Sequence, residues 1–200
     1  MSVSHVSDAI KMAQLTLEND NFESARKEFG SILLVDDKNL AALIGLGDSC
    51  FGLGDYESAE AAYRKGLVME PSNPDALFSL AATLRGTEYY NEAVTLYRLG
   101  FGEEPDRTEA YWELAYSLEM LDDKVGAEEA YKTCLRHHPE HGMATHLLAA
   151  MTGMNTGRAP QNYIRDLFDD YAETFDSELI GDLKYVVPDL IEKTLSQHLA

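Results

Sequence analysis

A small residue returns along this chain at a constant interval of 34 residues. The residue is alanine, at Ala25, Ala59, Ala93 and Ala127. Four positions after each alanine stands an aromatic residue: Phe29, Tyr63, Tyr97 and Tyr131. A unit that recurs at a fixed interval cannot bury its apolar face alone, so neighbouring units must stack and share one continuous core.

The residue types within one interval predict a pair of antiparallel helices. A hydrophobic residue precedes each alanine by thirteen positions and is itself followed by a small residue, in the pairs Met12-Ala13, Leu46-Gly47, Leu80-Ala81 and Leu114-Ala115. Helices approach closely only where side chains are small, and the aromatic residue one turn after the alanine fills the remaining gap. Proline cannot continue a helix, so the second helix of a pair ends before Pro71, Pro105 and Pro139; Asp37 takes this slot in the first unit.

This pattern resembles the tetratricopeptide repeat, which has the same period and the same small, aromatic and proline positions. The resemblance implies an all-α fold, a right-handed superhelix of about four helix-turn-helix repeats. We expect repeats near residues 6–39, 40–73, 74–107 and 108–141, a capping helix at 142–153, and a C-terminal helical extension at 154–200. The first unit matches least well, as expected of a terminal repeat with one face in water.

The composition narrows the classes of partner. A net charge of −19 disfavours nucleic acids and anionic membranes, because affinity for both depends on Lys and Arg. The two cysteines, Cys50 and Cys134, form no disulfide framework and fall on core positions. The first residues show no secretory-signal pattern, and no apolar run approaches about 20 residues. We therefore expect a soluble, cytoplasmic protein that binds proteins or peptides.

The first helices of such repeats line a concave groove, and its aromatic residues suit an extended or helical peptide. We predict that the groove-facing residues include Ile10, Gln14 and Ala82, together with a ligand-binding set: Ile44, Asp48, Phe51, Phe78, Arg85, Trp112, Tyr116 and Glu119. The alternative is that some of these side chains belong to the core between repeats. Family members that clamp a chaperone's C-terminal carboxylate use Lys and Asn in slots that here hold other residues, so no such clamp is expected.

Two motifs that suggest chemistry have structural explanations. The stretch "GLGDSCFGLG" (45–54) contains spaced glycines, but a phosphate-binding loop must follow a strand, whereas these glycines fall in a repeat's first helix and its turn. The stretch "HHPEH" (137–141) lies in a connection between repeats, and a structural zinc normally needs four ligands. We predict no metal site and no catalytic residue.

Residues 158–195 contain a second resemblance, in "LFDDYAETFD" (167–176) and "LKYVVPDLIEKTL" (183–195). They resemble the lead-in to the catalytic domain of bacterial methyltransferases that use S-adenosylmethionine and carry N-terminal tetratricopeptide repeats. By this resemblance Tyr171 and Phe175 are the residues nearest the cofactor cleft. The strand and glycine-rich turn that receive the cofactor in that family do not occur within these 200 residues, so no cofactor is expected in this chain.

The role of the C-terminal extension remains open between three interpretations. Its apolar stripe, Tyr163, Leu167, Tyr171 and Phe175, has the period of an amphipathic helix. The stripe could complete the array of repeats as part of a free-standing adaptor. It could mediate self-association, or it could belong to the hinge and lid of a larger methyltransferase for which the repeats recruit the substrate.

Overall fold

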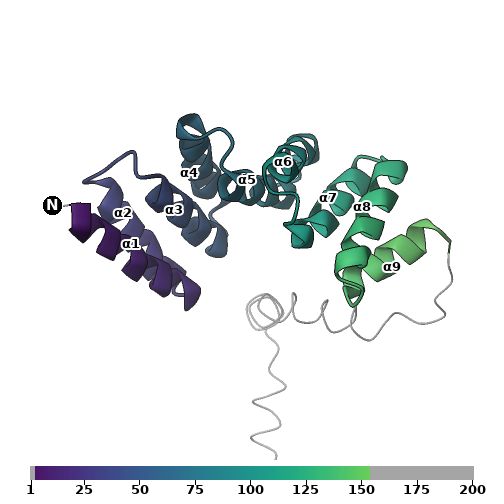
Figure 1. The fold of residues 1–200 in the computed structure, drawn as a ribbon, viewed down its shortest axis with the longest axis horizontal. Helices are drawn as coiled ribbons and strands as arrows, with labels where there is room; N and C mark the ends of the chain where they lie inside the picture. The colour runs from purple at the N-terminus through teal and green to yellow at the C-terminus, as the bar shows by residue number, and fades with distance from the viewer. Residues whose placement is uncertain (1–2, 154–200) are drawn as a thin grey trace, which may run out of the picture. The chain divides into compact units, whose positions relative to one another are not determined.

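A computed structural model describes residues 3–153 of the chain. The predicted C-terminal extension, with Tyr171 and Phe175, lies outside the described residues. The described chain forms two compact units, one ending at His138 and one beginning at Pro139. Their helices, shown in Figure 1, are α1 (Val3–Glu18), α2 (Phe22–Leu33), α3 (Leu40–Gly52), α4 (Tyr56–Met69), α5 (Pro74–Gly86), α6 (Tyr90–Glu103), η1 (Thr108–Ala110), α7 (Tyr111–Met120), α8 (Lys124–His137) and α9 (Gly142–Met151).

The predicted all-α class is confirmed, since residues 3–153 contain helices and no strand. In the first unit each odd-numbered helix packs against the even-numbered helix that follows it, and α2, α4 and α6 also pack against the next odd-numbered helix. The odd-numbered helices α1, α3, α5 and α7 contact one another in turn. We call the surface made by these four helices, away from the even-numbered ones, the inner face.

A side chain caps the N-terminus of most helices in the repeats. Asn39 and Asn73 accept a backbone N–H at the starts of α3 and α5, and Asp55 and Asp123 do so at α4 and α8. These caps satisfy amide groups that have no partner within the helix. Arg107, 34 residues after Asn73, has no acceptor in its side chain. Here the 3₁₀ turn η1 precedes α7, and Ala110 is the residue before the first turn of α7.

The turn inside each helix pair requires a left-handed backbone conformation. The residues that adopt it are again 34 positions apart: Asp20, Gly54, Glu88 and Asp122, with φ between 57° and 72°. Glycine and aspartate tolerate this conformation better than glutamate, whose longer side chain gives no local hydrogen bond to the turn. The repeat period is therefore visible in the backbone as well as in the core.

The core consists of the residues that the period identified. The four alanines from Ala25 to Ala127 are 0% exposed, and the four aromatic residues that follow them are at most 1% exposed. Two glycines make room for these rings. A Cβ atom on Gly45 would collide with the Phe29 ring, and one on Gly47 would collide with the Tyr63 ring.

One predicted core position behaves differently in the first repeat. Met12 is 61% exposed, whereas Leu80 and Leu114, in the same slot of later repeats, are 1% and 7% exposed. Later repeats follow another helix pair, and within the described chain no helix precedes α1. The first repeat therefore has an open apolar surface where the others are covered.

Within residues 3–153, no helix combines the length and the hydropathy that crossing a bilayer requires. A helix is present where the capping helix was predicted: α9 spans Gly142–Met151 and ends two residues before the predicted end at 153. Whether it caps the array stays a prediction, as do the bounds of the repeats as domains.

Replacing Gly47 with alanine tests whether close approach of helices stabilises the repeats. The new methyl group must displace the buried Tyr63 ring, and such overpacking costs about 1–3 kcal/mol. This exceeds the gain of about 0.5–1 kcal/mol from removing a helical glycine. We expect Gly47→Ala to lower the free energy of unfolding, measured by urea denaturation. The control is Gly30→Ala in α2. No atom outside the adjacent residues and the backbone of α2 lies within 4 Å of a Cβ added there, so we expect a small gain in the free energy of unfolding. Equal stability of both variants would show that Tyr63 does not require the glycine.

Candidate functional site

The eight predicted ligand-binding residues lie on three neighbouring helices of the first unit. Ile44, Asp48 and Phe51 lie on α3, Phe78 and Arg85 on α5, and Trp112, Tyr116 and Glu119 on α7. Seven of the eight are half-buried, and Phe78 is the exception. Half-buried side chains contribute to the packing between helices and also present atoms to a partner.

Ile44 and Asp48 line a cavity of about 240 Å³ on the inner face. Its other lining residues come from α1, α3 and the start of α5, so three repeats contribute to it. They are Gln14, Leu17, Leu40, Ala41, Gly45, Asn73 and Asp75. The cavity thus combines apolar walls with two carboxylates and two amides. Gln14, Ile44 and Asp48, all predicted to face the groove, thus line this cavity together.

Asp48 is tied to two repeats by hydroxyl groups. The Tyr63 hydroxyl on α4 donates to Asp48 Oδ1 at 2.7 Å, and the Ser79 hydroxyl on α5 donates to the same oxygen at 3.4 Å. Loss of hydration raises the pKa of the Asp48 carboxyl, although these two hydrogen bonds favour the charged form. Burial and the neighbouring carboxylate raise the pKa of Tyr63 too, so its hydroxyl stays protonated and remains a donor.

Arg85 and Trp112 form a second feature of the inner face, where α5 meets α7. The guanidinium carbon of Arg85 lies 5.2 Å from the centre of the Trp112 ring, which is cation–π geometry. The Nε atom of Arg85 is buried and makes no hydrogen bond within the described residues. Next to them Tyr116 contacts Tyr90 edge to face, with 6.3 Å between ring centres.

The prediction that Phe78 is an exposed groove residue is wrong. Its side chain is 5% exposed, and its ring packs against Tyr97 and Phe101. Gly100 on α6 makes space for it, because a Cβ atom there would lie 2.9 Å from the ring. Phe78 therefore belongs to the core between helices, as the alternative interpretation of these aromatic residues allowed. The signal that sequence reasoning missed is the glycine at position 100.

A glutamate on α7 was also missed by sequence reasoning. The buried Tyr97 donates its hydroxyl to Glu113, which lies in the next repeat. Tyr131 donates to Glu119 at 3.0 Å, so this residue, predicted to face the groove, is a hydrogen-bond acceptor for a core tyrosine. The sequence contains a signal for these pairs, since a buried tyrosine hydroxyl needs a hydrogen-bond partner.

Arg107 was not predicted either, although it organises one edge of the cavity. Its guanidinium pairs with Asp75 at 2.6 Å, and with Glu104 at 3.2 Å. It also lies 4.9 Å from the centre of the Phe78 ring, which it helps to cover. Asp75 therefore has a cationic partner, whereas Asp48 has only hydroxyl donors within residues 3–153.

Phe51 lies near the end of α3, where its ring meets Tyr56 edge to face at 5.5 Å. It does not line the cavity that contains Ile44 and Asp48.

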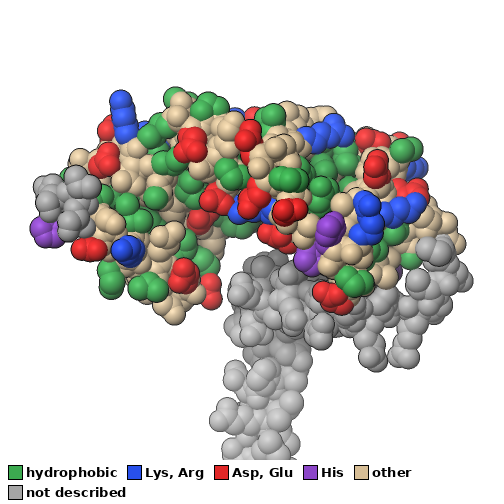
Figure 2. All heavy atoms as spheres, viewed as in Figure 1, with side chains coloured by type: hydrophobic (Ala, Val, Ile, Leu, Met, Phe, Trp, Pro, Cys, Tyr) green, Lys and Arg blue, Asp and Glu red, His purple; other side chains and the backbone are tan. Residues whose placement is uncertain are grey.

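Figure 2 shows acidic, basic and apolar side chains interspersed over the face of the described chain that it presents. This mixture suits recognition of a polypeptide, which offers apolar and charged groups along its length.

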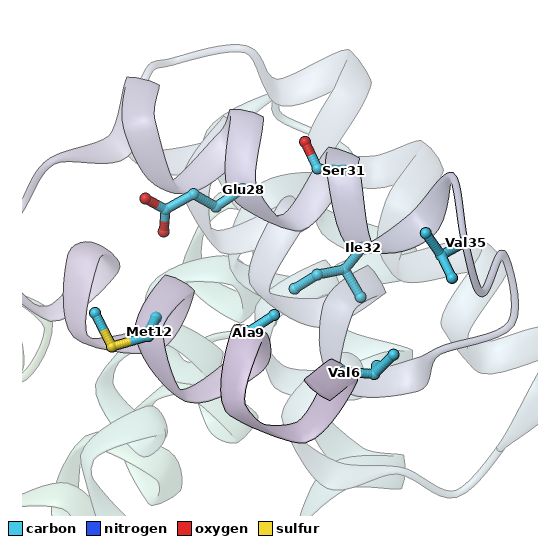
Figure 3. Close-up of a pocket in the computed structure, with 7 residues that line it drawn as sticks. All are labelled: Val6, Ala9, Met12, Glu28, Ser31, Ile32 and Val35. Carbon is cyan, nitrogen blue, oxygen red and sulfur yellow. The ribbon is translucent and has the colours of Figure 1, made fainter. Parts of the chain in front are cut away.

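A second, more apolar cavity of about 270 Å³ lies between α1 and α2 (Figure 3). In Figure 3 Val6, Ala9 and Met12 come from α1, with Ile32 and Val35 facing them. This is the surface that remains open in the first repeat because no helix pair covers it within the described chain.

Other chemistries find no support among the described residues. No group of His, Cys, Asp and Glu in residues 3–153 could hold a metal ion. His138 is hydrogen-bonded to Thr108 at 2.8 Å, and His141 caps α9. Both cysteines are buried, and neither forms a disulfide. Burial raises the pKa of the Cys134 thiol to about 11, which suppresses the reactive thiolate. Gly45 and Gly47 lie inside α3, as expected from their role in packing.

Replacing Asp48 with asparagine tests whether its charge opposes folding. A carboxyl whose pKa is raised in the folded state binds protons more readily there than in the unfolded chain. Stability therefore falls as the pH rises from the ordinary aspartate pKa through the raised one, and the penalty is complete at neutral pH. Asparagine keeps the acceptor for Tyr63 without the charge. We expect Asp48→Asn to gain about 0.5–2 kcal/mol at pH 7, a range typical of stabilising substitutions. The difference in stability between the variant and the original protein should vanish in acid. A variant that is less stable than the original at pH 7 would contradict the prediction.

The tetratricopeptide repeat family matches residues 10–76 and 51–99 of the chain. Among solved structures, MamA 41-end from Desulfovibrio magneticus RS-1 is similar over 90% of this chain and 96% of its own, with a TM-score of 0.68 and 19% identity. A crystal structure of MamA protein gives a TM-score of 0.65 at 16% identity, over 84% and 94% of the two chains.

The first TPR of Spaghetti (RPAP3), bound to the HSP90 peptide SRMEEVD, is similar over 57% of this chain and 90% of its own. Its TM-score is 0.55 and its identity 23%. No match was found among curated proteins. At these identities a structural likeness establishes the fold, and the family match establishes the kind of repeat that builds it. The described residues thus form an all-α array of tetratricopeptide repeats.

Proposed function

We propose that this protein is an interaction scaffold that binds a segment of another protein along the inner face of α1, α3, α5 and α7. The observation that carries the proposal is the cavity at Ile44 and Asp48, which lies on the same face as the Arg85–Trp112 pair. An extended chain placed along this face meets first an apolar and acidic recess and then an aromatic surface with a guanidinium group.

The contacts on this face favour a polypeptide over a small molecule. The features lie on successive first helices, so a ligand must be long to reach more than one of them. An extended chain supplies side chains to separate pockets and amide groups to the surface between them. The RPAP3 structure adds support, because a related array there holds a peptide. The proposal includes a cytoplasmic location and no bound cofactor.

Trp112 is the side chain whose removal best tests peptide binding. It is the only tryptophan in the chain, and aromatic anchors carry much of the free energy in such interfaces. On an array of random nonapeptides, we expect Trp112→Ala to weaken the binding of retained peptides by about tenfold or more, the effect of losing at least about 1.4 kcal/mol. Intrinsic fluorescence of Trp112 should also change when such a peptide is added to the unaltered protein.

The matched control is Tyr89→Ala. Tyr89 is an aromatic residue that is 63% exposed in the turn between α5 and α6, and it does not line the cavity at Asp48. We expect it to leave binding unchanged. Thermal unfolding of both variants separates lost binding from lost fold. If a folded Trp112→Ala protein binds peptides as tightly as the original, the proposed face is the wrong one.

We also propose that the scaffold recruits substrates for a methyltransferase that uses S-adenosylmethionine. The support is the resemblance of residues 158–195 to a methyltransferase lead-in, which includes Tyr171 and Phe175 and lies outside the described residues. The test is to read the gene beyond the codon for Ala200. We expect a strand followed by a glycine-rich turn and then an acidic residue. A stop codon there would contradict this role and favour a free-standing adaptor, with the C-terminal helices capping the array or mediating self-association.

A further inference from the structure

The cavity at Asp48 has the form of a recess for one long side chain. Leu17, Leu40 and Ile44 provide apolar walls, and Asp48 and Asp75 bring carboxylates to the same space. A side chain that fits must therefore be apolar along its length and polar or cationic at its end. Lysine and arginine have this character, because their methylene stems pack on apolar surface while their charged ends seek acceptors.

The two carboxylates of the recess differ in what already binds them. Asp75 is paired with Arg107 at 2.6 Å, so its charge is largely balanced. Both hydrogen bonds that Asp48 accepts from described residues go to Oδ1, from Tyr63 and Ser79. Oδ2 accepts none of the hydrogen bonds found within residues 3–153. The Asp48 side chain is half-buried and lines the recess.

Asp48 thus carries a charge that the described fold compensates only in part, because Arg107, whose charge favours the ionised form, is paired with Asp75, whose charge opposes it. Two neutral hydroxyls hold the carboxylate, and hydration is partly lost. A charged group in this state gains most from a partner of opposite charge, since hydrogen bonds to charged groups contribute more than neutral ones. Asp48 is half-buried and lines the recess, so a ligand in the recess can supply that partner.

We propose that this recess binds a lysine side chain of the peptide held on the inner face, with its ammonium group on Oδ2 of Asp48 and its stem against Ile44 and Leu17. This inference rests on the proposed function and names the ligand chemistry of one of its subsites. Lysine fits better than arginine because a single carboxylate oxygen is open. Guanidinium recognition favours two oxygens in parallel, whereas ammonium is a compact point charge.

The charge of the whole protein acts in the same direction. A net charge of −19 attracts basic segments over distances longer than a hydrogen bond, which raises the rate of encounter with a lysine-containing peptide. Long-range attraction does not choose a position along the peptide. The recess does so, because its apolar walls accept only one side chain at a time.

The experiment is an array of nonapeptides in which each position is scanned through the natural residues and norleucine, probed with the 200-residue chain. Norleucine has the methylene stem of lysine without the ammonium group. We expect one peptide position to prefer lysine over norleucine by about tenfold or more, the size of a hydrogen bond to a charged group. Asp48→Asn should abolish that preference while peptides remain bound through the other subsites.

The control is Asp20→Asn, the same substitution at an exposed aspartate in the turn between α1 and α2, which should retain the preference. Because Asp48→Asn is expected to be at least as stable as the original protein, unfolding will not mimic the loss. Peptides that bind with no preference for lysine, or a preference that survives Asp48→Asn, would overturn this inference and leave peptide binding intact. A preference for arginine over lysine would contradict the single-oxygen geometry. Binding of no peptide at all would overturn both proposals.

Discussion

The structure depends on one recurring contact, in which a buried ring on the second helix of each repeat packs against a first helix; two of the four rings meet a glycine there. Phe29 lies on Gly45 of the next repeat, and Tyr63 lies on Gly47 of its own. These rings are almost completely buried, so they set the distance between helices and the offset between repeats. Every surface that the first helices present, including the inner face, follows from that offset.

The same contact determines where charge appears on the inner face. Three of the four buried rings are tyrosines, and each hydroxyl donates to a carboxylate on a first helix: Asp48, Glu113 and Glu119. Phe29 has no hydroxyl and needs no such partner. The core therefore requires acceptors at the boundary between buried and exposed regions. A carboxylate that accepts a hydrogen bond from a buried tyrosine has a second oxygen or a second lone pair that a ligand can use.

The period of 34 residues predicted the helix pairs, their core alanines and rings, and the helix at Gly142–Met151, because each depends on contacts inside one unit or between equivalent slots. The site was less predictable. Phe78 occupies the slot of Ile44 and Trp112, and nothing at that slot shows that it is buried; the cause is the space beside Gly100. Tyr97 takes its acceptor from the next repeat and Tyr131 from its own, a choice that depends on the exact offset of neighbouring helices.

Comparison of the repeats with one another separates positions that the fold dictates from positions that it leaves open. The slot of Gly47 holds alanine in the other three repeats, and those alanines are 0% exposed, so packing admits only small residues there. The slot of Asp48 holds Gln14, Ala82 and Tyr116 in the other repeats, residues that share neither size nor charge. The fold accepts them because Tyr97 and Tyr131 donate to Glu113 and Glu119, which lie in other slots. In the second repeat Asp48 is itself the acceptor for the buried Tyr63 hydroxyl. That role requires an acceptor but no charge, so the negative charge of Asp48 in a recess on the inner face is best explained by what it binds.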